Sequence, residues 1–272
     1  MTPFILTVAP NGARRTKADH PAMPLTPAEL AATAKACVEA GAAMLHFHVR
    51  DADGRHSLDP ELYRAATAAV RKAVGPGPIL QATSEAAGIY RPEEQIGAIT
   101  AFRPEAVSVA LREIVPDEGH ESAASAFYAK LRSARVMVQH ILYEAADLAR
   151  FQALRARGVI PGERHALLFV LGRYTETQES DPGDLLPFLT AGADADLWSV
   201  CAFGRREGQA IAVAAALGGH GRVGFENNFH LVDSRLAAGS EELVAQAASL
   251  CRGIGRDLAN ADEAREIFAA LD

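Results

Sequence analysis

Cysteine is scarce in this sequence: its 272 residues include only Cys37, Cys201 and Cys251, which lie far apart along the chain. An odd, sparse set of thiols excludes the disulfide framework of a small secreted protein and favours a reducing compartment. No apolar run reaches the length of about 18 residues that a membrane-spanning helix needs. The first residues also lack a basic segment followed by an apolar one. We therefore expect no signal peptide, no membrane partner and a cytoplasmic location.

An excess of basic residues is missing as well, since the formal net charge is −7. Nonspecific binding to nucleic acid requires a basic surface that neutralises phosphates, so we expect no nucleic-acid partner. Two glycine-rich signatures are also absent from the sequence. No dinucleotide-binding fingerprint follows the first apolar run, and no P-loop occurs. The sequence therefore gives no sign of a dinucleotide-binding fold or of a P-loop phosphate site.

Short apolar runs alternate with longer segments of helical periodicity, an order typical of parallel α/β proteins. The expected strands cover residues 4–8, 43–49, 79–83, 106–111, 136–142, 166–171, 197–203 and 222–226. The expected helices cover residues 26–40, 59–74, 92–102, 121–133, 144–157, 184–191, 208–217 and 241–254. Thr26 is expected to cap the first helix, and Gly41 is expected to end it.

Eight strand–helix pairs favour a closed (β/α)₈ barrel, the TIM barrel, although strand count alone also fits an open doubly wound sheet. The length suits one such barrel, and no linker divides the chain. We therefore predict an α/β protein with a single TIM-barrel domain over residues 1–272. A short helical extension over 261–270 is expected at its carboxyl end.

The carboxyl end of the second expected strand carries the motif His46-Phe47-His48. Side chains alternate between the two faces of a strand, so both histidines point to the same side. Two imidazoles on one side can chelate a divalent ion, and imidazole suits zinc. The alternative is a pair of barrel-core histidines with ordinary hydrogen-bond partners.

A carboxylate that could complete such a site is Glu226, at the end of the eighth expected strand. Strands one, two and eight are neighbours in a closed barrel, so Glu226 would lie near the two histidines. Together they would form a site of two histidines and one carboxylate, with coordination positions left for substrate. The alternative is a salt bridge between Glu226 and Arg222.

Other polar residues lie at the strand ends where a barrel enzyme places its active site. Thr83 and Ser84 end the third expected strand, and Ser108 lies in the fourth. These three hydroxyls are candidates for substrate binding, and their alternative role is to cap the following loops.

Arginines follow several of the same strands. Guanidinium groups bind carboxylate and phosphate in a bidentate manner, so a cluster of them indicates an anionic substrate or cofactor. Taken singly, each arginine is better explained as a surface charge. The arginines concerned are Arg14, Arg50, Arg173 and Arg205.

The chain resembles the β-keto acid cleavage enzyme family, which includes 3-keto-5-aminohexanoate cleavage enzyme. The similarity runs in order over nearly the whole sequence. The motifs that carry it are Leu6-Thr7, His46-Phe47-His48-Val49-Arg50, Phe169-Val170-Leu171-Gly172, Gly218-Gly219-His220-Gly221-Arg222-Val223-Gly224-Phe225-Glu226, Ile254-Gly255-Arg256 and Ala264-Arg265-Glu266-Ile267.

This resemblance implies a (β/α)₈ barrel that forms homodimers or homotetramers. It also implies a zinc ion held by His46, His48 and Glu226. The implied reaction condenses a β-keto acid with acetyl-CoA and cleaves the product, which gives acetoacetate and a new acyl-CoA. A Lewis-acid metal suits this chemistry because it can hold the carboxylate and keto oxygens of the acid.

The resemblance also implies roles for residues around the ion. Thr83 matches a family serine that helps hold substrate, and Ser108 matches a family threonine with a similar role. Arg222 matches an arginine near the catalytic carboxylate. That carboxylate, an aspartate in the family pattern Gly-Phe-Glu-Asp-Asn, corresponds to Asn227 in this chain.

Three departures from the family pattern affect the expected activity. A carboxamide at Asn227 cannot accept a proton at neutral pH as the family's aspartate does. Arg14 replaces a glutamate that meets the substrate's amino group in the aminohexanoate enzyme, so an anionic substrate tail is favoured here. A family glutamate in the fifth strand is replaced by Ile141, which follows Gln139 and His140.

Three functional hypotheses therefore stand at this point. The first is a zinc-dependent β-keto acid cleavage enzyme that acts on an anionic keto acid with acetyl-CoA. The second is a divergent metal-assisted reaction without CoA, and the third is a non-catalytic protein that binds a metal and a ligand. Asn227 motivates the second and third hypotheses.

Overall fold

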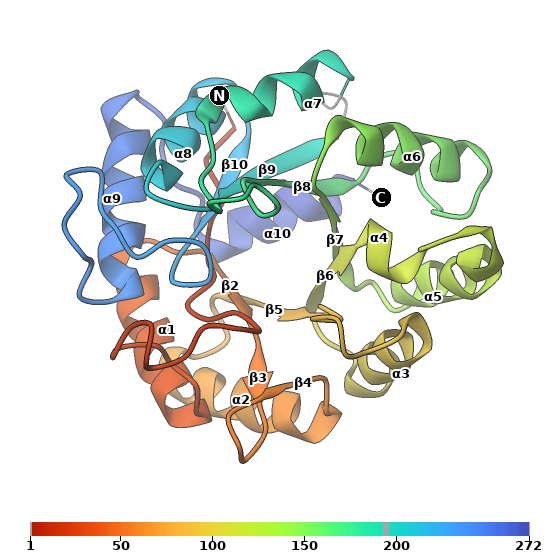
Figure 1. Cartoon of the computed structure of the whole chain (residues 1–272), viewed down its shortest axis with the longest axis horizontal. Helices are drawn as coiled ribbons and strands as arrows, with labels where there is room; N and C mark the ends of the chain where they lie inside the picture. Colours follow the sequence, from red (N-terminus) through yellow and green to blue (C-terminus); the bar gives the residue numbers. More distant parts are fainter. Residues whose placement is uncertain (1, 193–195, 272) are drawn as a thin grey trace.

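A computed structural model describes residues 2–192 and 196–271 of the chain. Within this part, eight parallel strands close into a barrel in the order β1-β10-β9-β8-β7-β6-β5-β2, which confirms the predicted TIM barrel. The barrel strands are β1 (Leu6–Val8), β2 (Met44–Phe47), β5 (Ile79–Thr83), β6 (Ala106–Ala110), β7 (Met137–Leu142), β8 (Ala166–Leu171), β9 (Leu197–Ala202) and β10 (His220–Val223). Figure 1 looks along the barrel, with the helices arranged around the strands.

The helices of the outer layer begin and end close to the predicted positions. They are α1 (Pro27–Ala40), α2 (Pro60–Val74), α3 (Pro92–Phe102), α5 (Glu121–Ser133), α6 (Ala145–Ala156), α7 (Leu186–Thr190), α8 (Glu207–Ala216) and α9 (Ser240–Gly253). Thr26 caps α1 in a reciprocal capping box with Glu29, and Gly41 ends the helix in a left-handed conformation. Local capping chemistry therefore explains why the limits of α1 could be predicted.

Several short elements were not predicted. They are the hairpin of β3 (Val49–Arg50) and β4 (His56–Ser57), the helix α4 (Leu111–Ile114) and the 3₁₀ turns η1 (Glu118–His120) and η2 (Pro182–Leu185). Each contains only two to four residues. Runs this short have too few residues to show a periodicity of two or of 3.6.

The amino end of the barrel is closed by apolar packing. Helix α10 (Ala261–Ala269) contributes Ala264 and Phe268 to a cluster with strand residues such as Met44 and Ile79. Figure 1 shows α10 lying across the barrel opening. With this end plugged, the polar strand ends gather at the other opening. Of the described helices, none is long and apolar enough to cross a membrane.

Two predicted strand limits are wrong near the candidate site. The eighth strand ends at Val223, so Glu226 lies in the following turn and not in the strand. Gly224 ends β10 with a φ of +135°, a backbone conformation that leaves the strand. The second strand ends at Phe47, so His48 lies between β2 and the β3–β4 hairpin.

Candidate metal centre

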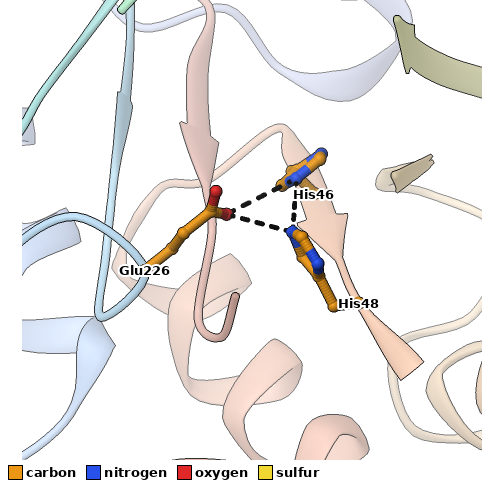
Figure 2. A group of neighbouring side chains, drawn as sticks. All are labelled: His46, His48 and Glu226. Carbon is orange, nitrogen blue, oxygen red and sulfur yellow. Dashed lines mark hydrogen bonds and ion pairs between the residues drawn. The ribbon is translucent and has the colours of Figure 1, made fainter. Parts of the chain in front are cut away.

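The structure brings His46, His48 and Glu226 together at the carboxyl end of the barrel. The Nε2 atoms of the two histidines are 3.2 Å apart, and Glu226 Oε2 is 3.4 Å from His46 Nε2 and 3.5 Å from His48 Nε2. Figure 2 shows the carboxylate and both imidazole edges pointing toward one another. Among the described residues, this is the group of metal-ligand side chains with mutually close donor atoms.

These distances fit a shared ion. Tetrahedral ligands at roughly 2.0–2.1 Å from zinc lie about 3.3–3.4 Å from one another. Glu226 Oε2 is buried and has no hydrogen-bond partner in the described part of the chain. An unpartnered carboxylate oxygen that faces two imidazole nitrogens is the arrangement a divalent cation would satisfy.

The charge states also suit metal binding. Burial, and then the nearby Arg222 guanidinium, hold the pKa of His46 well below its ordinary value, which favours the neutral imidazole that ligates metals. Burial opposes the negative charge on Glu226, but Arg222 and the two imidazoles hold its pKa well below the usual range. The site therefore offers the neutral imidazole of His46 and an ionised carboxylate at Glu226.

A chain of buried hydrogen bonds orients His46. Gln81 Oε1 lies 3.0 Å from His46 Nδ1, and Gln81 Nε2 donates to Gln139 Oε1 over 3.2 Å. Gln139 Nε2 in turn donates to Ser199 Oγ over 3.3 Å. Because this chain directs the Gln81 oxygen toward Nδ1, it places the proton there and leaves Nε2 free to bind an ion.

The position of His48 is fixed through its backbone. Asn11, in the loop after β1, accepts a hydrogen bond from the His48 amide over 3.0 Å. The Asn11 amide group donates to the carbonyls of His48 and Pro24. The His48 ring also has Glu85 near its other edge, with 3.8 Å between Glu85 Oε2 and His48 Nδ1.

Arg222 and Asn227 lie behind the carboxylate ligand. Arg222, on β10, donates to Glu226 Oε1 and to the sulfur of Cys201, each over 3.2 Å. Asn227 is fully buried, and its amide nitrogen lies 3.4 Å from the same sulfur. Its side-chain oxygen has no hydrogen-bond partner in the described part of the chain. The Cys201 thiol thus contacts both Arg222 and Asn227.

A pocket opens beside the candidate ligands, and three of the predicted substrate-binding residues line it: Arg14, Thr83 and Ser108. The Ser108 hydroxyl is buried without a hydrogen-bond partner in the described part of the chain. Ser84 is outside the lining, and its hydroxyl donates to the Ser108 carbonyl over 2.8 Å. Ser84 thus joins the loop after β5 to β6.

The arginines considered from the sequence separate into two groups. Arg173 lines the pocket together with Arg14, whereas Arg205 is exposed and outside the lining. Arg50 donates to the carbonyls of Gly12, Arg15 and Gly54, which holds the loop after β1 against the hairpin.

Sequence reasoning missed Glu85, Tyr143 and Arg15, which also line the pocket, and His56, whose ring lies 5.3 Å from that of His48. His56 lies on the unpredicted hairpin. Glu85 follows Thr83 and Ser84 directly, so its position after a barrel strand was the one signal that could have identified it.

A (β/α)₈ barrel that gathers two imidazoles and a carboxylate beside a pocket at its strand ends belongs to the class of metal-dependent barrel enzymes. The family model for beta-keto acid cleavage enzymes matches residues 3–269. The chain belongs to the beta-keto acid cleavage enzyme family, which is metal-dependent. It is therefore an enzyme of the carbon–carbon bond-cleaving acyltransferase type.

Relatives with known names extend over nearly the whole chain. A 3-keto-5-aminohexanoate cleavage enzyme from Fusobacterium nucleatum is 30% identical over 99% of this chain and 98% of its own length. A 3-oxoadipate:acetyl-CoA acetyltransferase from Cupriavidus necator is 29% identical over 98% of this chain and 94% of its own length.

Solved structures support the fold. ObcA, in a ternary complex with a C4-CoA adduct and oxalate, superposes with a TM-score of 0.74 at 18% identity, covering 92% of this chain and 68% of that one. A type I 3-dehydroquinate dehydratase from Clostridium difficile superposes with a TM-score of 0.59 at 9% identity, covering 93% of this chain and 94% of that one.

Proposed function

We propose that this enzyme is zinc-dependent and condenses a β-keto acid that has an anionic tail with acetyl-CoA, giving acetoacetate and a new acyl-CoA. The observation that carries the proposal is the group of His46, His48 and Glu226 beside a pocket lined by four guanidiniums and two carboxylates. This excess of cations favours an anionic substrate over a cationic one.

The names of the two relatives specify β-keto acids that differ at the end remote from the keto acid group. One name specifies an amino-substituted acid, and the other a dicarboxylic acid. Arg14 and Arg173 line the pocket here, and both would repel an ammonium group. The pocket therefore favours a substrate of the dicarboxylate kind.

The proposed reaction makes and breaks one carbon–carbon bond. The α-carbon of the β-keto acid loses a proton and forms a bond to the acetyl carbon of acetyl-CoA. The bond between the acetyl carbon and sulfur breaks and releases CoA as a thiolate, which adds to the original keto carbon. The bond between that carbon and the α-carbon then breaks, so the original acyl group leaves on CoA and the α-carbon regains a proton to give acetoacetate. A divalent ion at His46, His48 and Glu226 would supply Lewis-acid polarisation of the acid's oxygens.

Several residues of the chain would assist this reaction directly. The unpartnered hydroxyl of Ser108 can donate a hydrogen bond to the acid, and Thr83 offers a second hydroxyl in the same pocket. Arg222 keeps Glu226 ionised and so ready to bind a cation. In the family's pattern an aspartate accepts the α-proton. Asn227 occupies that position here, and its carboxamide cannot accept a proton.

Asn227 is the observation that favours a second candidate function. A metal-binding barrel without a carboxylate at this position could catalyse a CoA-independent reaction of a related acid, or bind a ligand without turnover. Strict dependence of turnover on CoA would exclude the first alternative. Turnover of any kind would exclude the second.

Incubation of the zinc-loaded enzyme with acetyl-CoA and a panel of β-keto acids tests the main proposal. We expect acetoacetate, with the highest kcat/KM for acids that have a second carboxylate. The control is the double variant His46→Ala, His48→Ala, which should form none. Absence of turnover with every acid in the panel, in protein of full zinc occupancy, would contradict the proposal.

The metal site has its own test. Elemental analysis of the purified protein should give stoichiometric zinc, and the same double variant should contain none. Zinc retained by the variant would refute the site. We also propose a homodimer or homotetramer, which light scattering of the native protein would measure.

A further inference from the structure

Four arginines line the pocket, and two of them already have partners. Arg15 donates to the carbonyls of Phe225 and Asn227, and its guanidinium lies over the Phe229 ring. Arg222 donates to Glu226 and Cys201. Both therefore support the loop and the carboxylate ligand, and neither has an obvious role in holding a substrate tail.

Arg173 has a different environment. Its guanidinium lies 5.1 Å from the centre of the Phe203 ring, and its side chain is 17% exposed. Glu85 Oε1 is 3.9 Å from Arg173 Nη2, which is too far for a hydrogen bond. Among the described residues, none accepts a hydrogen bond from this guanidinium. Arg173 is thus a largely desolvated cation whose donors are available inside the pocket.

The loop that carries Arg173 is held firmly. Gly172 has a φ of +75°, and a Cβ there would lie 2.8 Å from the backbone of Glu179 and Ser180. Ser180 donates to the Phe203 carbonyl through both its amide and its hydroxyl. The loop after β8 is therefore joined to the end of β9, where Phe203 meets the guanidinium. This arrangement fixes Arg173 before any ligand binds, which lowers the entropic cost of binding.

Arg14 is a weaker candidate for the same role. It lines the pocket but is exposed, and it makes no hydrogen bond or salt bridge with the described part of the chain. An exposed, hydrated cation gains less from a carboxylate than one stacked on a ring and shielded from water.

We propose that Arg173, stacked on Phe203, is a carboxylate-binding subsite for the far end of the substrate. This inference rests on the proposed function and refines it. The substrate class is a β-keto dicarboxylate whose near end lies at the candidate metal ligands and whose second carboxylate pairs with Arg173. Glu85 is the counter-ion beside Arg173 before that carboxylate arrives.

Two acids of equal chain length give a direct test: 3-oxoadipate, and 3-oxohexanoate, which has a methyl group in place of the second carboxylate. In Arg173→Gln, kcat/KM for 3-oxoadipate should fall about 10- to 100-fold, the effect expected for a lost charged hydrogen bond. The value for 3-oxohexanoate should change less than about threefold, since it has no partner for the guanidinium. Arg173→Lys should give an intermediate loss, because it keeps the charge without the planar fork.

The matched control is Arg205→Gln, which removes an exposed arginine outside the pocket and should leave both values unchanged. Equal losses for both acids in Arg173→Gln would indicate a merely structural role and overturn the proposal. The proposal would also be overturned if Arg14→Gln lost the preference for 3-oxoadipate over 3-oxohexanoate while Arg173→Gln kept it.

A binding measurement separates this proposal from the proposed reaction. Adipate and hexanoate lack the reactive keto group, and their effect on the melting temperature of zinc-loaded protein reports binding alone. We expect adipate to stabilise the wild type and Arg205→Gln more than hexanoate does, with no such difference in Arg173→Gln. This result would support the subsite even if no acid were turned over. An equal adipate effect in wild type and Arg173→Gln, or none in the wild type, would overturn it.

Discussion

Asn227 stands where the family pattern has an aspartate, with an amino group in place of one carboxylate oxygen. This change removes the group that would accept the substrate's proton. Its amide nitrogen lies against Cys201, and its side-chain oxygen is buried without a partner in the described part of the chain. Burial raises the pKa of Cys201 to about 11, so this thiol does not replace the missing base at neutral pH.

Asn227→Asp should restore a carboxylate at the position of the family's aspartate, next to the Cys201 thiol that Arg222 also contacts. If the chain follows the family's reaction, acetoacetate formation should rise about 100-fold or more, the usual contribution of a positioned general base. Initial rates with acetyl-CoA and 3-oxoadipate measure this. Asn228→Asp is the control, because it adds the same group one residue away and should give no gain. An unchanged rate in Asn227→Asp would mean that another group accepts the proton in this enzyme.

Gln81 is the residue that sets the tautomer of His46. Gln81→Leu removes the acceptor at Nδ1 and leaves a buried imidazole N–H without a partner. Loss of such an outer partner typically lowers metal affinity about 10- to 100-fold. Competition with a zinc chelator measures the change. Gln152→Leu, on α6 and remote from the site, should leave the affinity unchanged, and an equal loss there would point to general destabilisation.

At the scale of elements, the sequence predicted the strands and helices of the barrel, but it did not predict where some strands end. Alternating apolar runs and capping residues such as Thr26 identified the strands and helices because these signals are local. The end of β10 was missed because the φ of Gly224 depends on contact with the neighbouring strand. His48 was likewise assigned to a strand, although the side chain of Asn11 holds its backbone in the loop.

The sequence predicted the site residues that lie at strand ends. It did not predict the residues that reach the site from another strand. His46 and Glu226 were identified from their positions in the barrel. The partners Gln81 and Glu85 were not identified, because the register between β2 and β5 brings them to the histidines and the sequence does not show that register. Arg173 could be named from the sequence as one of several arginines, but the Phe203 ring that distinguishes it was visible only in the fold.

Gly224 links the end of β10 to the candidate ligand two residues later. A Cβ at this position would clash with the Ala9 carbonyl, on a backbone with a φ of +135°. Gly224→Ala should therefore destabilise the protein by about 2 kcal/mol or more and displace Glu226. Thermal unfolding and zinc content measure the two effects. Gly77→Ala is the control, since it meets no atom within 4 Å, and equal losses in both variants would contradict this reading.

At the scale of the whole molecule, Glu207 makes stability depend on pH. It begins α8 and accepts hydrogen bonds from Gly224 and Asn228, which ties that helix to the turn containing Glu226. Burial raises its pKa from 4.5 to about 8. Between these values the folded protein keeps a proton that the unfolded chain releases, so stability falls as pH rises through this window.

Glu207→Gln should remove this part of the pH dependence. The wild type should lose roughly 1–4 kcal/mol of unfolding free energy between pH 5 and pH 9 relative to the variant. Urea unfolding at several pH values measures both proteins, and the other titrating groups cancel in the comparison. Parallel curves for the two proteins would show that Glu207 is ionised across the range.

The candidate metal ligands also connect the two ends of the chain. His46 lies on β2, His48 follows that strand, and Glu226 follows β10. Both strands pair with β1, so a bound ion would join the elements on either side of the first strand. The apolar core involves the whole barrel, so the metal-free protein should remain folded. Zinc at a thousandfold excess over its Kd should add about 4 kcal/mol. For a chain of this size that corresponds to a rise in Tm of about 10 °C.

Thermal unfolding with zinc and after chelation measures this shift. In the double variant His46→Ala, His48→Ala the shift should disappear, because a single carboxylate holds the ion weakly. An equal shift in the variant would mean that zinc stabilises the protein from another site. A shift confined to the wild type would show that the ion stabilises the folded barrel through these two histidines.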